Sequence, residues 1–230
     1  NKLSELDSPG EWFHDAIAGM LYFWAPGNAN PNNLVVEASI HEHGVEIGWQ
    51  RQHIRVQDLA FRKQRFSGVH NQGGNHIRVT GCTFEQHFTA IKSYANNGIY
   101  SDNTINYTFG SGMSLVDNNT LVSGNQFTNI SLHAGLGEST WGYYGMFILG
   151  SGNTVRSNNF HTTGYTAIFF EGNTLVEKNV IRHVNKTLND GGGIYFDNAS
   201  GAIIQDNIIS NVEGNLESTA NNHPHRWYMG

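Results

Sequence analysis

An internal repeat of about 22 residues restricts the fold of this chain more than any other feature of its sequence. Each copy contains short apolar–polar alternations around a fixed anchor position, which is Asn in most copies. The anchors are Leu59, Cys82, Asn103, Asn125, Asn158, Asn179 and Asn207. Four of the six steps between them are 21–23 residues long, and the steps of 33 and 28 residues contain insertions. A fixed period of this kind predicts a solenoid in which equivalent strands stack coil upon coil.

A second short strand follows each anchor and shows which face of the solenoid is buried. Side chains alternate between the two faces of a strand, so apolar residues at equivalent positions share one face. In the aligned copies these residues are Val69, Ile91, Met113, Met146, Ile168 and Ile194. That face is therefore predicted to form the core of an all-β parallel β-helix solenoid of about seven coils.

The recurring Asn at the anchor has a structural explanation. A stacked Asn at an inward bend can bond to the coils above and below through its amide, and Asn also tolerates the left-handed backbone conformation. Cys82 occupies the same column, and we expect it to be buried there as a small apolar residue.

The repeat resembles that of the pectate-lyase-like, right-handed parallel β-helix superfamily over roughly residues 35–210. The resemblance implies right-handed coils but does not single out one reaction, because this architecture carries lyases, hydrolases, epimerases and phage adhesins. The composition agrees with a turn-rich β protein, since the chain has 27 Gly, many Asn and few charged residues, and Gly and Asn are poor helix formers.

Residues 1–34 lie outside the repeat and are predicted to form an N-terminal β-hairpin or cap segment before a β-helix over residues 35–230. Strands at 8–15 and 20–26 would be joined by a turn at 16–19. The run of Gly10-Glu11-Trp12, Asp15, Leu21-Tyr22 and Pro26 resembles a segment of bacterial β-helix xylosidases, xylanases and fucosidases. That resemblance implies a carbohydrate-active enzyme, secreted or periplasmic in a bacterium. No cap follows the last repeat, so further coils or domains after it, or a covering partner, are the alternatives.

Charge and hydropathy exclude several partners. The net charge is −6 and no basic stripe offsets it, which argues against nucleic acid or an anionic membrane surface. No apolar run approaches the roughly 20 residues of a membrane-spanning helix. A polysaccharide or oligosaccharide is the partner that the resemblance implies.

Two outward-facing columns on the second strand carry the candidate chemistry. One column is Gln72, Tyr94, Val116, Leu149, Glu171 and Asp197; the other is His70, Lys92, Ser114, Phe147, Phe169 and Tyr195. Glu171 and Asp197 fall on neighbouring coils, so their backbones should lie about 4.8 Å apart. Two carboxyl groups this close can serve as the acid and the nucleophile of a glycosidase, and the spacing fits the roughly 5–5.5 Å of retaining enzymes. The alternative is a structural acidic pair, or one that binds a cation such as Ca²⁺.

The two insertions and the C-terminal tail would lie at one corner of the solenoid and wall a groove beside the acids. Aromatic residues with polar neighbours suit sugar rings, which have apolar faces and hydroxyl edges. The predicted substrate-binding residues are Phe147, Phe169, Tyr195, Trp141, Tyr143, Tyr144, His183, Asp190, His225, Arg226 and Trp227.

The twelve His residues do not predict a metal site. The tight clusters are His41-Glu42-His43 and His223-Pro224-His225, and either could supply half of a site, but no third and fourth ligand is evident. No other cofactor is implied.

Three functions remain after these observations. The first is a glycoside hydrolase that cleaves a plant or algal polysaccharide through Glu171 and Asp197. The second is a polysaccharide lyase or uronate epimerase, which needs a base such as Lys92 and a means to neutralise the uronate carboxylate. Lys92 is three coils from Glu171, and the chain has only 13 Lys and Arg. The third is a carbohydrate-binding or adhesin solenoid without catalysis.

Overall fold

The computed structural model describes residues 2–137, 139 and 142–214. The chain divides into two compact units, Asn1–Ala38 and Ser39–Gly230. None of the helices among these residues is long and apolar enough to span a membrane.

The smaller unit is built around the predicted hairpin. Strands β1 (Trp12–Asp15) and β2 (Met20–Phe23) pair antiparallel, with Asp15 opposite Met20 at the turn. The Asp15 carboxylate shapes this turn by accepting the backbone N–H groups of Ile17 and Ala18, both at 3.0 Å. Three single-turn 3-10 helices complete the unit: η1 (Leu3–Glu5), η2 (Pro26–Asn28) and η3 (Pro31–Asn33).

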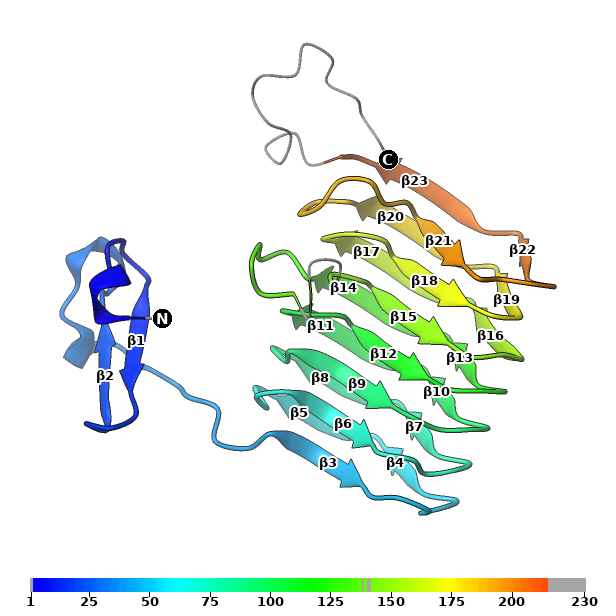
Figure 1. Cartoon of the computed structure of the whole chain (residues 1–230), viewed down its shortest axis with the longest axis horizontal. Coiled ribbons are helices and arrows are strands. Elements are labelled where there is room, and N and C mark those ends of the chain that lie inside the picture. Colours follow the sequence, from blue (N-terminus) through cyan, green and yellow to red (C-terminus); the bar gives the residue numbers. More distant parts are fainter. Residues whose placement is uncertain (1, 138, 140–141, 215–230) are drawn as a thin grey trace, which may run out of the picture. The chain divides into compact units, whose positions relative to one another are not determined.

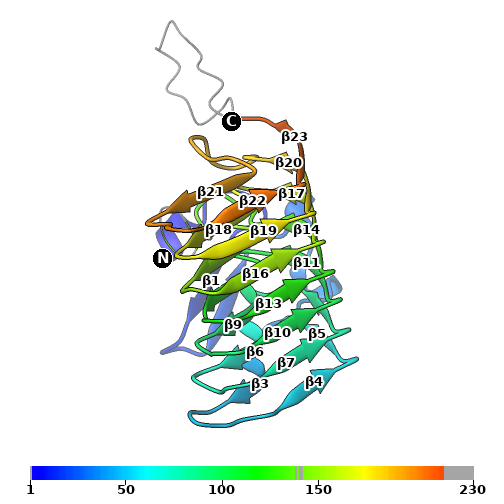
Figure 2. The ribbon, with the colours of Figure 1, turned by 90° about the vertical axis from the view of Figure 1, so that its right-hand side faces the viewer.

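The larger unit is a parallel β-solenoid with three seven-stranded sheets (Figures 1 and 2). We name each sheet after its first strand. The β3 sheet contains β3 (His43–Ile47), β6 (Ser67–Asn71), β9 (Thr89–Ser93), β12 (Met113–Val116), β15 (Met146–Leu149), β18 (Ile168–Glu171) and β21 (Ile194–Asp197). The β4 sheet contains β4 (Arg55–Gln57), β7 (Arg78–Thr80), β10 (Ile99–Ser101), β13 (Leu121–Ser123), β16 (Asn153–Arg156), β19 (Thr174–Glu177) and β22 (Ile203–Gln205). The β5 sheet contains β5 (Ala60–Arg62), β8 (Thr83–Glu85), β11 (Thr104–Thr108), β14 (Gln126–Ile130), β17 (Asn159–Thr163), β20 (Val180–Val184) and β23 (Ile208–Val212).

Each inner strand pairs in parallel with its equivalents one coil before and one coil after it, and the strands of the first and last coils pair on one side. This arrangement confirms the predicted solenoid of about seven coils, and Figure 2 shows the β4 sheet stacked in that order. Five of the six residues predicted to face the core, Val69, Ile91, Met113, Met146 and Ile168, have no exposed surface. The sixth, Ile194 on β21, is partly buried and packs against the core. Burial of this continuous apolar column is the main stabilising contribution to the stack.

The predicted Asn ladder is also confirmed. The Asn103 side-chain amide donates to Asn125 Oδ1 at 2.9 Å, and Asn125 donates in the same way to Asn158. Cys82 is 1% exposed in the same column, and its N–H donates to Asn103 Oδ1. The anchors are not in the left-handed conformation, however. The residue before each anchor adopts it instead: Asp58, Gly81, Asp102, Gly124, Ser157, Lys178 and Asp206 all have φ between 55° and 69°.

Candidate functional site

The outward face of the β3 sheet carries both predicted columns in the predicted register. Glu171 is opposite Asp197, Phe147 is opposite Phe169, and Phe169 is opposite Tyr195. Period-two alternation along β15, β18 and β21 produces this arrangement, because the intervening Ile148 and Phe170 point into the core and are fully buried. Parallel pairing one coil apart therefore brings residues 26 positions apart in the sequence side by side.

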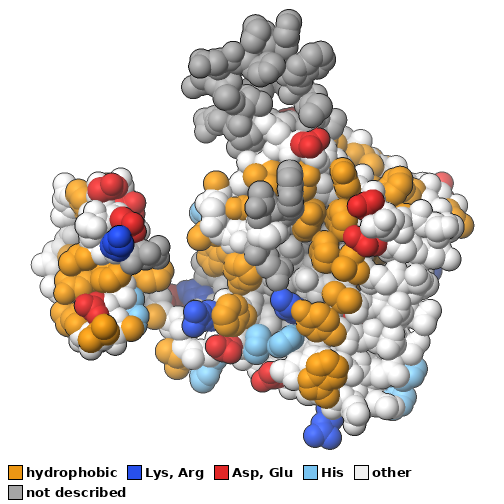
Figure 3. Space-filling view, viewed as in Figure 1, with side chains coloured by type: hydrophobic (Ala, Val, Ile, Leu, Met, Phe, Trp, Pro, Cys, Tyr) orange, Lys and Arg blue, Asp and Glu red, His pale blue; other side chains and the backbone are white. Residues whose placement is uncertain are grey.

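An aromatic ladder runs along this face. The rings of Phe147 and Phe169 stack at 5.1 Å between centroids, and those of Phe169 and Tyr195 stack at 5.9 Å. Tyr144 packs over the ladder at 5.4 Å from Phe147 and 5.2 Å from Phe169. Tyr195 is 46% exposed. Figure 3 shows hydrophobic side chains in a band along this face, with acidic side chains beside its upper part. The ladder consequently offers an apolar surface at positions where a solvated strand would normally be polar.

The two acids lie at the ends of their strands, beside this ladder. Glu171 is the last residue of β18 and is half-buried, whereas Asp197 ends β21 and is exposed. Gly172 turns the chain away after Glu171 in the left-handed conformation, and the Gly150 carbonyl approaches it so closely that a Cβ would be 2.2 Å from that oxygen. The Asn198 N–H donates to Asp197 Oδ1 at 2.8 Å and orients that carboxylate.

The first insertion follows β14 and contributes two tyrosines with different roles. Tyr144 reaches the ladder, as described above. Tyr143 is 5% exposed, and its hydroxyl accepts the Gly135 N–H at 2.7 Å. Tyr143 therefore holds the inserted loop in place and does not present its ring to the groove.

The second insertion, between β20 and β21, places Asp190 near the tyrosines. The Tyr165 hydroxyl donates to the Asp190 carbonyl oxygen at 2.7 Å, and the Tyr165 ring lies 5.6 Å from that of Tyr144. Burial, followed by the neighbouring Tyr144, Asp190 and Tyr195, raises the pKa of Tyr165 to about 12. Tyr165 could not be predicted from the repeat, because it lies outside the repeat columns.

His183, another predicted substrate-binding residue, lies away from this face. His183 belongs to β20 of the β5 sheet rather than to the second insertion, because that strand continues to Val184. Its ring contacts that of His161 at 5.0 Å, and its Nε2 is 3.3 Å from Asn211 Nδ2. Trp141, His225, Arg226 and Trp227 lie outside the described residues.

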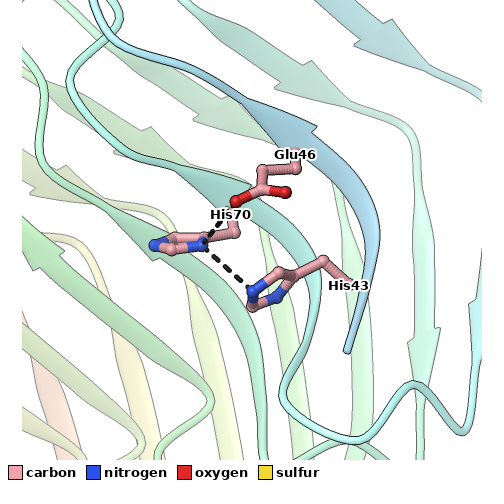
Figure 4. Close-up of side chains that lie close together, drawn as sticks. All are labelled: His43, Glu46 and His70. Carbon is pink, nitrogen blue, oxygen red and sulfur yellow. Dashed lines mark hydrogen bonds and ion pairs between the residues drawn. The ribbon is translucent and has the colours of Figure 1, made fainter. Parts of the chain in front are cut away.

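A groove of about 630 Å³ lies over the first coils of the same sheet. Its walls include Trp49, Phe66, Lys92 and Tyr94, and two histidines, His43 and His70, line it as well. His43 Nε2 is 3.2 Å from His70 Nδ1, which in turn is 4.0 Å from Glu46 Oε1. The three side chains point toward one another (Figure 4).

The electrostatics of this cluster centre on His70. Burial lowers the pKa of His70, and the neighbouring His43 and Lys92 lower it further, while Glu46 acts in the opposite direction. Among the described residues, this is the group of three His, Cys, Asp or Glu side chains whose ligand atoms all lie within 4.8 Å of one another.

The repeat did not predict this cluster, for a physical reason. Glu46 and His70 are direct neighbours in the outward column that continues with Lys92, Ser114 and Phe147. Strand β3 precedes the first anchor at Leu59, so its residues were not aligned with the columns. Extending the column back by one coil from His70 would have revealed Glu46.

Comparison with known proteins agrees with the geometry at the level of the fold. A family model described as "Right handed beta helix region" matches residues 138–224. No curated protein and no solved structure matches the chain. The family match over residues 138–224 and the three seven-stranded parallel sheets together fit the right-handed parallel β-helix superfamily.

Proposed function

We propose that this chain is a carbohydrate-active enzyme, specifically a glycoside hydrolase that cleaves a plant or algal polysaccharide on the outward face of the β3 sheet. The observation that carries the proposal is the register of Glu171 with Asp197 beside the aromatic ladder. Right-handed β-helix regions are common in carbohydrate-active enzymes, which supports the class of substrate.

The proposed reaction uses the two carboxyl groups in turn. Their backbones are neighbours in a parallel sheet, at a spacing of about 4.8 Å, which fits retaining glycosidases better than inverting ones. Asp197, whose carboxylate is oriented by the Asn198 N–H, attacks the anomeric carbon while Glu171 gives its proton to the departing glycosidic oxygen. Water then cleaves the glycosyl ester, with Glu171 taking a proton from that water and Asp197 leaving as carboxylate.

The aromatic ladder supports polysaccharide binding. Tyr144 and Tyr195 combine an apolar ring with a hydroxyl group, a combination that matches the apolar face and hydroxyl edge of a sugar. Asp190 is close enough to Tyr165, the neighbour of Tyr144, to help raise the pKa of Tyr165, and we assign Asp190 to a neighbouring subsite. A polymeric substrate of this kind supports a location in the bacterial periplasm or outside the cell.

A polysaccharide lyase is the second candidate, because His70 and Lys92 lie in the same outward column as the aromatic ladder. Lyase chemistry would use the groove around these residues rather than the carboxylate pair. It would leave an unsaturated sugar, whose near-ultraviolet absorbance a hydrolase product lacks.

The test is to incubate the protein with a panel of plant and algal polysaccharides and to compare it with Glu171→Gln and Asp197→Asn. We expect the wild type to release new reducing ends without unsaturated products, and each variant to lose about 10²–10⁴-fold of that activity. The matched control is Glu177→Gln. Glu177 is an acidic residue of the same coil as Glu171, but it lies on the β4 sheet, where its carboxylate accepts a hydrogen bond from Gln205. Full activity in both site variants would exclude the pair. Binding without turnover by the wild type would favour an adhesin.

A further inference from the structure

We propose that His43, Glu46 and His70 form a site for a divalent transition-metal ion, with Zn²⁺ as its representative. The site lies on the first two coils of the β3 sheet, in strands β3 and β6. It is separate from the proposed catalytic pair, which lies on β18 and β21.

The spacing of the donor atoms supports this assignment. Zinc bonds of about 2.0–2.1 Å at tetrahedral angles place neighbouring donor atoms roughly 3.3 Å apart. The His43 and His70 nitrogens are 3.2 Å apart, and the Glu46 oxygen is 4.0 Å from the His70 nitrogen. Because the Glu46 side chain is 52% exposed, we expect its carboxylate to move closer to His70 when an ion binds.

Two further side chains orient the ligands. His43 Nδ1 lies 2.8 Å from the hydroxyl of Ser67, which is 1% exposed. When Nδ1 donates to Ser67, Nε2 keeps the lone pair that a metal requires. Gln72 donates its side-chain N–H to Glu46 Oε1. Metal ligands are commonly fixed by second partners of this kind.

Other histidine pairs in the solenoid show what is particular to this site. His53 and His76 stack at 4.8 Å between ring centroids, and His161 and His183 lie 5.0 Å apart. Close approach of two histidines on adjacent coils therefore recurs along the solenoid and does not by itself mark a metal site. Within the described ranges, the His43–His70 pair is the one that also has a carboxylate within ligand distance.

The donor set identifies the class of ion. Two imidazole nitrogens and one carboxylate oxygen suit zinc and its neighbours in the first transition row, whereas Ca²⁺ prefers six to eight oxygen ligands. Three protein ligands leave a fourth position, which water would fill. Because His43 and His70 line the groove, that position faces it.

The experiment is isothermal titration of ZnCl₂ into the full chain after treatment with a chelator and dialysis. We expect one equivalent to bind the wild type, and Zn²⁺ to raise its Tm. His70→Ala and Glu46→Gln should each weaken Zn²⁺ binding by more than about 100-fold. Loss of a residue that only supports a ligand already costs up to about 100-fold, and these two variants lose a ligand itself. The matched control His76→Ala removes a stacked histidine from a pair without a carboxylate and should bind like the wild type.

Folding of each variant is checked by circular dichroism. If His70→Ala does not fold, Glu46→Gln carries the test, because the Glu46 side chain is half exposed. Absence of one-equivalent binding in the wild type would overturn the proposal. Wild-type affinity in folded Glu46→Gln and His70→Ala would also overturn it, since the ion would then bind at other histidines.

Discussion

Asn125 lies in the middle of the Asn ladder and bonds to the coils on both sides of it. Its amide nitrogen donates to the Tyr100 carbonyl and to Asn158 Oδ1, both at 2.9 Å. Its Oδ1 accepts the backbone N–H of Asn103 at 3.0 Å and the Asn103 amide at 2.9 Å. Because Asn125 is fully buried, water cannot replace these partners. At this scale the repeat predicted the ladder, but it did not show that the preceding residue makes the left-handed bend.

Replacement of Asn125 by Ala should lower the free energy of unfolding by roughly 3 kcal/mol, because buried Asn103 donors lose their acceptor. Cys82→Asn at the equivalent position should change the free energy of unfolding by less than about 1 kcal/mol. The new side-chain amide can donate to Asn103 Oδ1 and to the nearby Val56 carbonyl. Denaturant unfolding of both variants measures the difference. Equal destabilisation by the two substitutions would contradict the ladder as a source of stability.

His87 should make the fold sensitive to acid. Burial lowers the pKa of His87 to about 4, while its Nε2 lies 2.6 Å from Gln64 Oε1. Since the folded pKa is below the ordinary value of 6.5, the neutral ring stabilises the fold above pH 6.5 and this contribution is lost as the pH falls toward 4. Relative to His87→Gln, the wild type should lose about 2–3 kcal/mol between pH 7 and pH 4. Parallel pH profiles for the two proteins would show that His87 is not the cause.

The strands of the β3 sheet show how far an element could be predicted from its sequence. The alternation placed Glu171 beside Asp197 and Phe169 beside Tyr195, because the coil length fixes the register. The insertions carry no period, so the sequence could not show that Tyr143 turns inward while Tyr144 packs on the ladder. Strand β3 itself precedes the first anchor, so the repeat did not predict that Glu46 lies beside His70.

Tyr195→Ala should weaken oligosaccharide binding about tenfold, which corresponds to roughly 1.4 kcal/mol, because the exposed end of the aromatic ladder is lost. The measurement is isothermal titration in a Glu171→Gln background, where the proposed cleavage is blocked. Tyr107→Ala serves as the control, since Tyr107 belongs to a separate aromatic cluster with Phe109 and His133. A matching loss of affinity in the control would argue against a specific role for the ladder.

At the scale of the whole molecule, the regular stacking of coils determines which residues, distant in the sequence, lie side by side. Each coil adds one strand to all three sheets, so every substitution has predictable neighbours one coil away. Because of this regularity, the fold could be predicted from the sequence. The functional site was harder to predict, because the repeat determines which residues are neighbours but not which of them a ligand contacts.

The register between adjacent coils can be tested with engineered disulfides. Arg182 and Ser210 are register partners on β20 and β23, and parallel neighbours about 4.8 Å apart fall within the Cα range of a disulfide. The Arg182→Cys/Ser210→Cys protein should oxidise to a crosslinked form that is about 3–4 kcal/mol more stable than its reduced form. The pair Arg182→Cys/Ile208→Cys is offset by two residues and should crosslink poorly. Preferential crosslinking of the offset pair would refute the register.

The most direct test of the functional account is a double-mutant comparison of kcat/KM for Glu171→Gln, Asp197→Asn and the combined variant on a cleaved polysaccharide. Residues that act as one catalytic unit have strongly non-additive effects. Each single change should remove most of the activity, and the double variant should be scarcely worse than either one. Independent, multiplying losses, or a single variant with wild-type activity, would contradict the claim that the two carboxyl groups work together.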